Sequence, residues 1–85
     1  MTILTLKTND EEKNALEKGD QSFVIRSDKY HVTRGDLIKF QLMKMGKTVA
    51  STLDAKMFMV TNVMDYHNAP IERGFQLINF KEVRK

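Results

Sequence analysis

Residues 37–43 read Leu-Ile-Lys-Phe-Gln-Leu-Met, and their apolar and polar side chains alternate. Successive side chains of an extended chain point to opposite faces, so Ile38, Phe40 and Leu42 share one face. The two polar residues between them share the other face. This pattern predicts a β-strand that is buried on one side.

The sequence around this stretch predicts further strands. After a tight reversal, residues 48–53 are expected to return as a partner strand. Residues 56–64 are largely apolar on both faces, as expected of a central strand. Three more strands are expected at residues 3–7, 22–26 and 74–80. In the last of these, Phe75, Leu77 and Phe80 are expected to point inward.

A single helix is expected between the first two strands. Thr8 or Asn9 can cap its beginning, and Glu11 or Glu12 can complete a capping box. Gly19 suits the left-handed conformation that ends many helices. Closely spaced short strands with one early helix predict an α+β, mainly β fold. We expect a small barrel or strongly curled sheet with the short N-terminal helix packed on it.

Length and composition favour one small domain that spans residues 1–85. The chain has no cysteine, so neither disulfides nor thiolate metal sites can stabilise it. The N-terminal residues lack the features of a signal peptide, and no run approaches the ~18 apolar residues of a membrane span. We therefore expect a cytoplasmic protein without membrane contact, as a monomer or weak homodimer.

The chain carries 14 lysines and arginines against 11 acidic residues, which gives a formal net charge of +3. This excess suits a polyanionic partner such as RNA. It equally suits an ordinary solvated surface, because the basic residues are spread along the chain.

No motif predicts a metal site or a cofactor. His31 and His67 lie far apart in the sequence, and Asp65 alone near His67 makes a poor ligand set. Phosphate-binding glycine loops and dinucleotide motifs are absent from the sequence. The methionines are expected to fill the core.

Four short motifs occur in an order that resembles a known family. The first runs from Gly19 to Arg26, where a helix is expected to end and a strand to begin. The others are Gly35-Asp36-Leu37-Ile38, Val60-Thr61-Asn62-Val63 and Gly74-Phe75-Gln76-Leu77-Ile78-Asn79-Phe80. This order resembles the ASCH domain of the PUA-like superfamily, which includes small stand-alone bacterial and phage proteins. The resemblance implies a small PUA-like β-barrel that binds RNA or a modified nucleoside.

Two departures from the family pattern bear on catalysis. The family motif is G-x-K-x-x-E-x-R, and this chain has Gln21 in place of the lysine and Val24 in place of the glutamate. Some small bacterial members are acetylcytidine amidohydrolases, in which that lysine is catalytic. A neutral amide cannot serve as the base or nucleophile of such a mechanism. We therefore expect no catalytic residues, with a related amidohydrolase as a third hypothesis.

Arg26 is retained from the motif, and its planar guanidinium suits a phosphate or a base edge. We predict a set of ligand-binding residues that supply polar contacts, point charges or a stacking ring. They are Lys7, Gln21, Ser22, Arg26, Lys29, Tyr30 and Lys39. In the alternative interpretation, Arg26 pairs with Asp28, Asp36 or Asp65 and closes the barrel.

The leading functional hypothesis is a non-catalytic domain that binds RNA or a modified nucleoside. The second is a protein-interaction module, for example a phage protein that binds a host factor. It is favoured by the eroded motif, which indicates that the family's reaction is no longer required.

Overall fold

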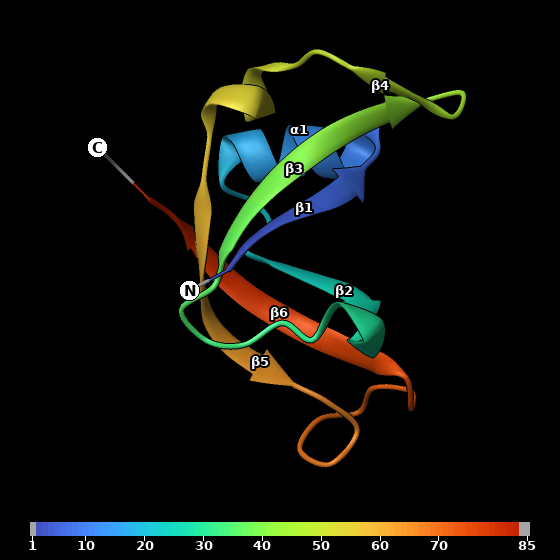
Figure 1. Ribbon diagram of the computed structural model, residues 1–85, viewed down its shortest axis with the longest axis vertical. Coiled ribbons are helices and arrows are strands. Elements are labelled where there is room, and N and C mark those ends of the chain that lie inside the picture. The colour runs from blue at the N-terminus through green and yellow to red at the C-terminus, as the bar shows by residue number, and fades with distance from the viewer. Residues whose placement is uncertain (1, 84–85) are drawn as a thin grey trace.

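The computed structural model describes residues 2–83 of the protein (Figure 1). The elements in chain order are β1 (Ile3–Thr8), α1 (Asp10–Lys18), β2 (Phe23–Ser27), η1 (Asp28–Tyr30), β3 (Leu37–Lys44), β4 (Lys47–Val49), η2 (Thr52–Ala55), β5 (Phe58–Met64) and β6 (Phe75–Glu82). The two η elements are single turns of 3-10 helix. The predicted α+β, mainly β class is confirmed.

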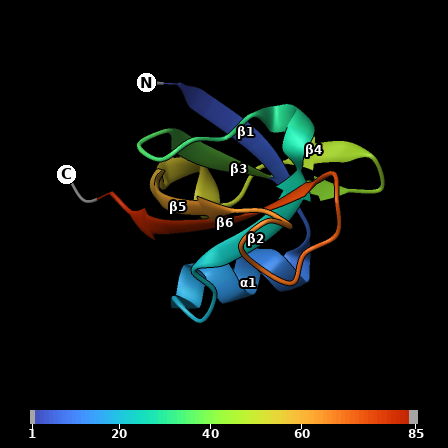
Figure 2. The ribbon, with the colours of Figure 1, turned by 90° about the horizontal axis from the view of Figure 1, so that it is seen from below.

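The strands form one mixed sheet in the order β1-β3-β5-β6-β2, and β4 pairs with the end of β3. β1 runs parallel to β3, whereas the other pairs are antiparallel. The sheet curls, so that β1 and β3 lie at the top of Figure 2 and α1 lies at the bottom. Within residues 2–83 no ladder joins β1 to β2. The sheet is therefore not closed, and the predicted barrel is not confirmed.

The core forms on the inward side of the curled sheet. Ile38, Phe40 and Leu42 are all buried, which confirms the alternation predicted for β3. The ring of Phe40 packs against Phe58 of β5 and Phe80 of β6, with ring centroids 5.4 and 5.5 Å apart. Three strands thus meet through one aromatic cluster at the centre of the sheet.

α1 begins and ends where the sequence predicts. The side chain of Asn9 accepts a hydrogen bond from the backbone N–H of Glu12 (2.8 Å), and Gly19 ends the helix with a φ of 78°. Leu16 is the buried residue of α1, so this apolar side chain anchors the helix to the core. The helices found between residues 2 and 83 are too short or too polar to cross a membrane.

The return strand predicted at residues 48–53 is shorter than expected. β4 pairs with β3 over Lys47–Val49, and the chain then turns into η2. Ser51 and Asp54 form a capping box around this turn, so their side chains satisfy backbone N–H groups that a strand would pair elsewhere. Leu53 is fully buried, so the turn inserts an apolar side chain into the core.

The inward face of β6 also differs from the prediction. Phe80 is buried as expected, but Phe75 is 40% exposed. Two residues five positions apart cannot share a face of a regular strand. Packing selects the even positions, because Ile78 lies opposite the buried Val24 of β2 and Phe80 lies opposite the buried Val60 of β5.

Candidate ligand-binding site

β2 places Arg26 two positions after the buried Val24, on the same side of the strand. The guanidinium donates three hydrogen bonds to groups of this chain. Nη1 donates to the carbonyl of Ile25 (3.0 Å), and Nη2 donates to the carbonyl of Lys7 (2.9 Å). Nη2 also forms a salt bridge with Glu12 Oε1 (2.6 Å). Arg26 therefore connects β2, the end of β1 and the first turn of α1, and we call this set of contacts the Arg26 bridge.

Side chains occupy the edge of β2 that faces away from β6. The carbonyl of Ser22 accepts a hydrogen bond from a backbone N–H of β6 (3.0 Å). Alternation then directs the carbonyls of Phe23 and Ile25 to the opposite edge. Gln21 Nε2 donates to the first of these (2.7 Å) and Arg26 to the second. The Arg26 bridge thus spans the gap between β2 and β1 that no backbone ladder closes.

This geometry agrees with the alternative interpretation, in which Arg26 forms an ion pair within the fold, but the acidic partner differs from the three that were predicted. Its partner is Glu12, and the two side chains are 21% and 18% exposed. Asp28, Asp36 and Asp65 form no salt bridge with Arg26 in the part of the chain that the structure describes. The guanidinium is therefore largely committed to contacts within the fold.

A cleft of about 980 Å³ opens between the C-terminal end of α1, η2, the start of β5 and the end of β6. Gln21 and Ser22, in the link from α1 to β2, line it together with the half-buried Lys39 of β3. Phe58 and Phe80 also contribute to the lining, so the cleft reaches the edge of the aromatic cluster. Arg26 does not line it.

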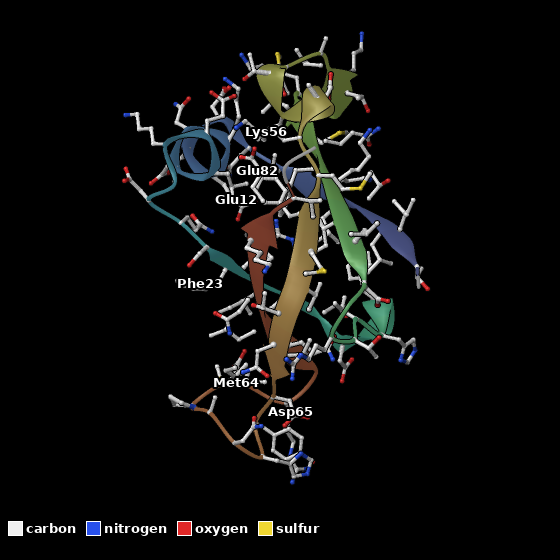
Figure 3. The ribbon with its side chains drawn as sticks, turned by 90° about the vertical axis from the view of Figure 1, so that its left-hand side faces the viewer. Glu12, Phe23, Lys56, Met64, Asp65 and Glu82 are labelled. Atoms are coloured by element: carbon white, nitrogen blue, oxygen red, sulfur yellow. The ribbon has the colours of Figure 1, made fainter. Side chains whose placement is uncertain are left out.

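Four lysines and three acids line this cleft. Lys56 forms a salt bridge with Glu82 (2.9 Å), and Figure 3 shows the pair between α1 and β5. Among residues 2–83, the other three lysines, Lys18, Lys39 and Lys81, form no salt bridge. Positive charges without a partner at a concave surface attract anions. We call this site the lysine cleft.

The two remaining acids of the lysine cleft are engaged elsewhere. Glu17 accepts a hydrogen bond from the Thr52 hydroxyl and forms a salt bridge with Lys13 (3.2 Å). These two contacts hold the pKa of Glu17 below its ordinary value, the Thr52 hydrogen bond having the larger effect. Asp54 Oδ2 accepts from the backbone N–H of Ser51 (3.1 Å). Both carboxylates therefore have other partners than the three lysines.

Three of the seven predicted ligand-binding residues, Gln21, Ser22 and Lys39, meet at the lysine cleft. Sequence reasoning missed Lys18 and Lys81. In the sequence, Lys18 is explained by the end of a helix and Lys81 by a charged segment after the last predicted strand. Only the fold brings these segment ends to one place.

The other four predicted residues lie elsewhere. Lys7 and Arg26 meet at the Arg26 bridge, but Lys7 contributes its backbone carbonyl and not its ammonium group. Lys29 and Tyr30 belong to η1, at the opposite end of β2 from the cleft. At ~3.3 Å per residue, the five residues from Ser22 to the end of β2 put them roughly 17 Å away.

No three histidine, aspartate or glutamate side chains between residues 2 and 83 gather so that they could hold a metal ion. Asp65 Oδ1 lies 3.2 Å from His67 Nδ1 and also accepts from the backbone N–H of His67 (2.9 Å). This backbone hydrogen bond is the main reason that the pKa of Asp65 lies below its ordinary value. The pair is a local turn contact on the surface.

No family model matches this chain, and the search of curated proteins finds no match. The resemblance to the ASCH domain therefore stays a prediction from the motifs. The lysine cleft and the surfaces around it are the features of the molecule that bear on its function.

Proposed function

We propose that this chain is a non-catalytic domain that binds RNA or a modified nucleoside in the lysine cleft. One observation carries the proposal. Lys18, Lys39 and Lys81 line the cleft without a carboxylate partner in the described residues, beside the polar side chains of Gln21 and Ser22. Ammonium groups suit phosphates, whereas an amide and a hydroxyl suit the hydrogen-bonding edge of a base.

The size and chemistry of the cleft support a nucleotide-sized ligand. Small-molecule sites usually measure about 300–1,000 Å³, and this cleft measures about 980 Å³. Gln21 Nε2 donates a hydrogen bond to the carbonyl of Phe23. Its Oε1 can therefore accept a hydrogen bond from the exocyclic amine of adenine or cytosine. The hydroxyl of Ser22 can donate or accept.

The proposal includes a PUA-like architecture and a cytoplasmic location. The strand order, the strong curl of the sheet and the Arg26 bridge between its two edges support a barrel-like arrangement. Here a side chain does part of the closing that a backbone ladder does in a complete barrel.

Neutralising the lysine cleft is expected to weaken RNA binding and its dependence on salt. Each phosphate contact that a single strand loses lowers the slope of log K against log salt by about 0.7. The double variant Lys39→Gln, Lys81→Gln should therefore flatten this slope by about 1.4. Fluorescence anisotropy of a labelled single-stranded RNA across a salt series measures it.

The matched control is Lys47→Gln, an exposed lysine in the β3–β4 hairpin that does not line the cleft. It should change the slope of log K against log salt by no more than about a third of the change expected for one lost phosphate contact. An equal effect of the control would mean that net charge alone drives binding. Absence of any RNA binding at low salt would overturn the RNA proposal.

A nucleoside monophosphate tests the position of the site. We expect its addition to shift the backbone NMR signals of Gln21, Ser22 and Lys39, because these residues line the cleft. Signals of Lys29 and Tyr30, at the far end of β2, should stay unchanged. Shifts confined to the η1 end of the strand would place the ligand outside the lysine cleft.

The chain is expected to leave acetylcytidine intact. Val24, which replaces the family's glutamate, is 1% exposed and belongs to the core. Neither the wild-type chain nor a Gln21→Lys variant should therefore release acetate, because a lysine alone lacks the acidic partner. Chromatography after prolonged incubation provides the measurement. Release of cytidine by the wild-type chain would show that the domain is an enzyme.

A further inference from the structure

Exposed apolar side chains form a row on the outward face of β2 and β6. Phe23, Ile25 and Phe75 are 44%, 47% and 40% exposed. Ile25 lies opposite the half-buried Leu77, and Phe75 lies opposite Ser27, so the row continues from one strand to the next. We call Phe23, Ile25, Phe75 and Leu77 the outer apolar row.

Among residues 2–83, the outward positions of β2, β5 and β6 carry no acidic residue. Beside the outer apolar row stand the amides of Asn79, opposite Phe23, and Asn62, on β5. Met64 follows on the same face, at the end of β5 and opposite Leu77, and Figure 3 labels it below Phe23. The charged group on this face of β6 is Lys81, which also lines the lysine cleft. On β6, Asn79 therefore separates the outer apolar row from Lys81 at the cleft.

A second copy of the chain is a poor occupant for this surface. Aromatic side chains bury about 150–250 Å² each, so the exposed parts of Phe23, Ile25 and Phe75 amount to roughly 250 Å². A stable protein interface needs about 800 Å² per partner. Pairing through the free edge of β2 is also obstructed. The side chains of Gln21 and Arg26 already donate hydrogen bonds to the backbone carbonyls at this edge.

Nucleic-acid bases match the row better. Single-stranded nucleic acids bind to protein surfaces on which exposed aromatic rings stack with bases beside a positively charged groove. Phe23 and Phe75 supply two rings. Phe23 lies opposite Asn79, four residues from Phe75 along β6, so the rings stand roughly 13 Å apart at ~3.3 Å per residue. Uncharged amides at the border can bind base edges without repelling phosphates.

We propose that the outer apolar row stacks the bases of a single-stranded nucleic acid whose phosphates lie in the lysine cleft. This inference rests on the proposed RNA-binding function and specifies it further: the ligand is an unpaired strand that runs from the cleft along β6 and β2. A duplex keeps its bases stacked inside and cannot use the row.

The double variant Phe23→Ala, Phe75→Ala tests the inference. Stacking on one aromatic ring contributes a factor of about 5 to 150 in affinity. We therefore expect at least a ~25-fold loss of affinity for a labelled uridine-rich 12-mer RNA, with the salt slope unchanged. Affinity for a duplex of the same length should stay as in the wild-type chain. The control is Ile3→Ala, an exposed apolar residue of β1 outside the row.

Each result has a distinct meaning. Wild-type affinity in the double variant, with salt-dependent RNA binding preserved, would overturn the base-stacking row and leave the lysine cleft in place. Absence of RNA binding by the wild-type chain and by every variant would overturn the proposed function itself. Sedimentation of the wild-type chain as a dimer that the double variant converts to a monomer, with RNA affinity unchanged, would assign the row to a second copy and overturn the inference.

Discussion

Replacement of Arg26 by alanine is expected to lower the free energy of unfolding by about 2–3 kcal/mol, because hydrogen bonds to charged groups contribute about 1.5–3 kcal/mol. The variant removes the donor for the carbonyls of Lys7 and Ile25 and leaves the carboxylate of Glu12 without its cation. In a domain of this size such a loss lowers the melting temperature by roughly 10–20 °C. Thermal unfolding followed by circular dichroism measures it.

Two variants separate the Arg26 bridge from other effects. Arg26→Lys keeps the charge but loses the planar fork, so it should fall between wild type and Arg26→Ala. A double-mutant cycle with Glu12→Gln should give a coupling energy of about 0.5–3 kcal/mol, as for residues in direct contact. Wild-type stability of Arg26→Ala, together with lost RNA binding, would instead make Arg26 a ligand contact.

Replacement of Phe40 by alanine is expected to cost about 3–5 kcal/mol, the usual range for a buried phenylalanine. Phe40 is 2% exposed and packs against Phe58 and Phe80, so the cavity opens where β3, β5 and β6 meet. Domains of this length have a total stability of about 4–13 kcal/mol. The variant should therefore unfold at a much lower urea concentration, with the slope of the urea transition unchanged.

The matched control for this substitution is Phe75→Ala. Phe75 is the same residue type but lies on the outward face of β6, where it is 40% exposed. Its replacement should cost about 1 kcal/mol or less. Equal losses for Phe40→Ala and Phe75→Ala would mean that the inward face of β6 has been assigned to the wrong set of alternate residues.

Features set by neighbouring residues could be predicted from the sequence. The alternation of Ile38, Phe40 and Leu42 identifies a one-sided strand, because the period of two is a property of the extended backbone. Asn9 and Gly19 identify the ends of α1, because capping depends on a few adjacent groups. These predictions needed no knowledge of what the elements pack against.

Features set by distant residues could not be predicted. Two aromatic positions of β6 compete for the core, and the choice of Phe80 over Phe75 depends on partners in β5 and β2. Glu12 suits a capping box on sequence grounds, but its carboxylate accepts from Thr8 and Arg26. The pairing of β1 with β3 is likewise not visible in either strand alone.

The same limit applies to the candidate site. Gln21, Ser22 and Lys39 were predicted through the motif and its flanking charges, and they do meet at the cleft. Lys18 and Lys81 come from the ends of elements that are adjacent only after folding. The outer apolar row has a similar origin, because its exposure depends on which face of β2 and β6 packs inward.

β6 lies between β5 and β2 in the sheet, although it comes after all the other strands of residues 2–83 in the sequence. Within residues 2–83, β2 has no other ladder partner. Val24, which is buried opposite Ile78 in the finished fold, is synthesised well before this partner strand. A ribosome that adds about 5–20 residues per second therefore makes Val24 seconds before β6 exists. Until then this apolar side chain is available to chaperones or to other nascent chains. Assembly of the sheet therefore waits until the segment after Gly74 has left the exit tunnel.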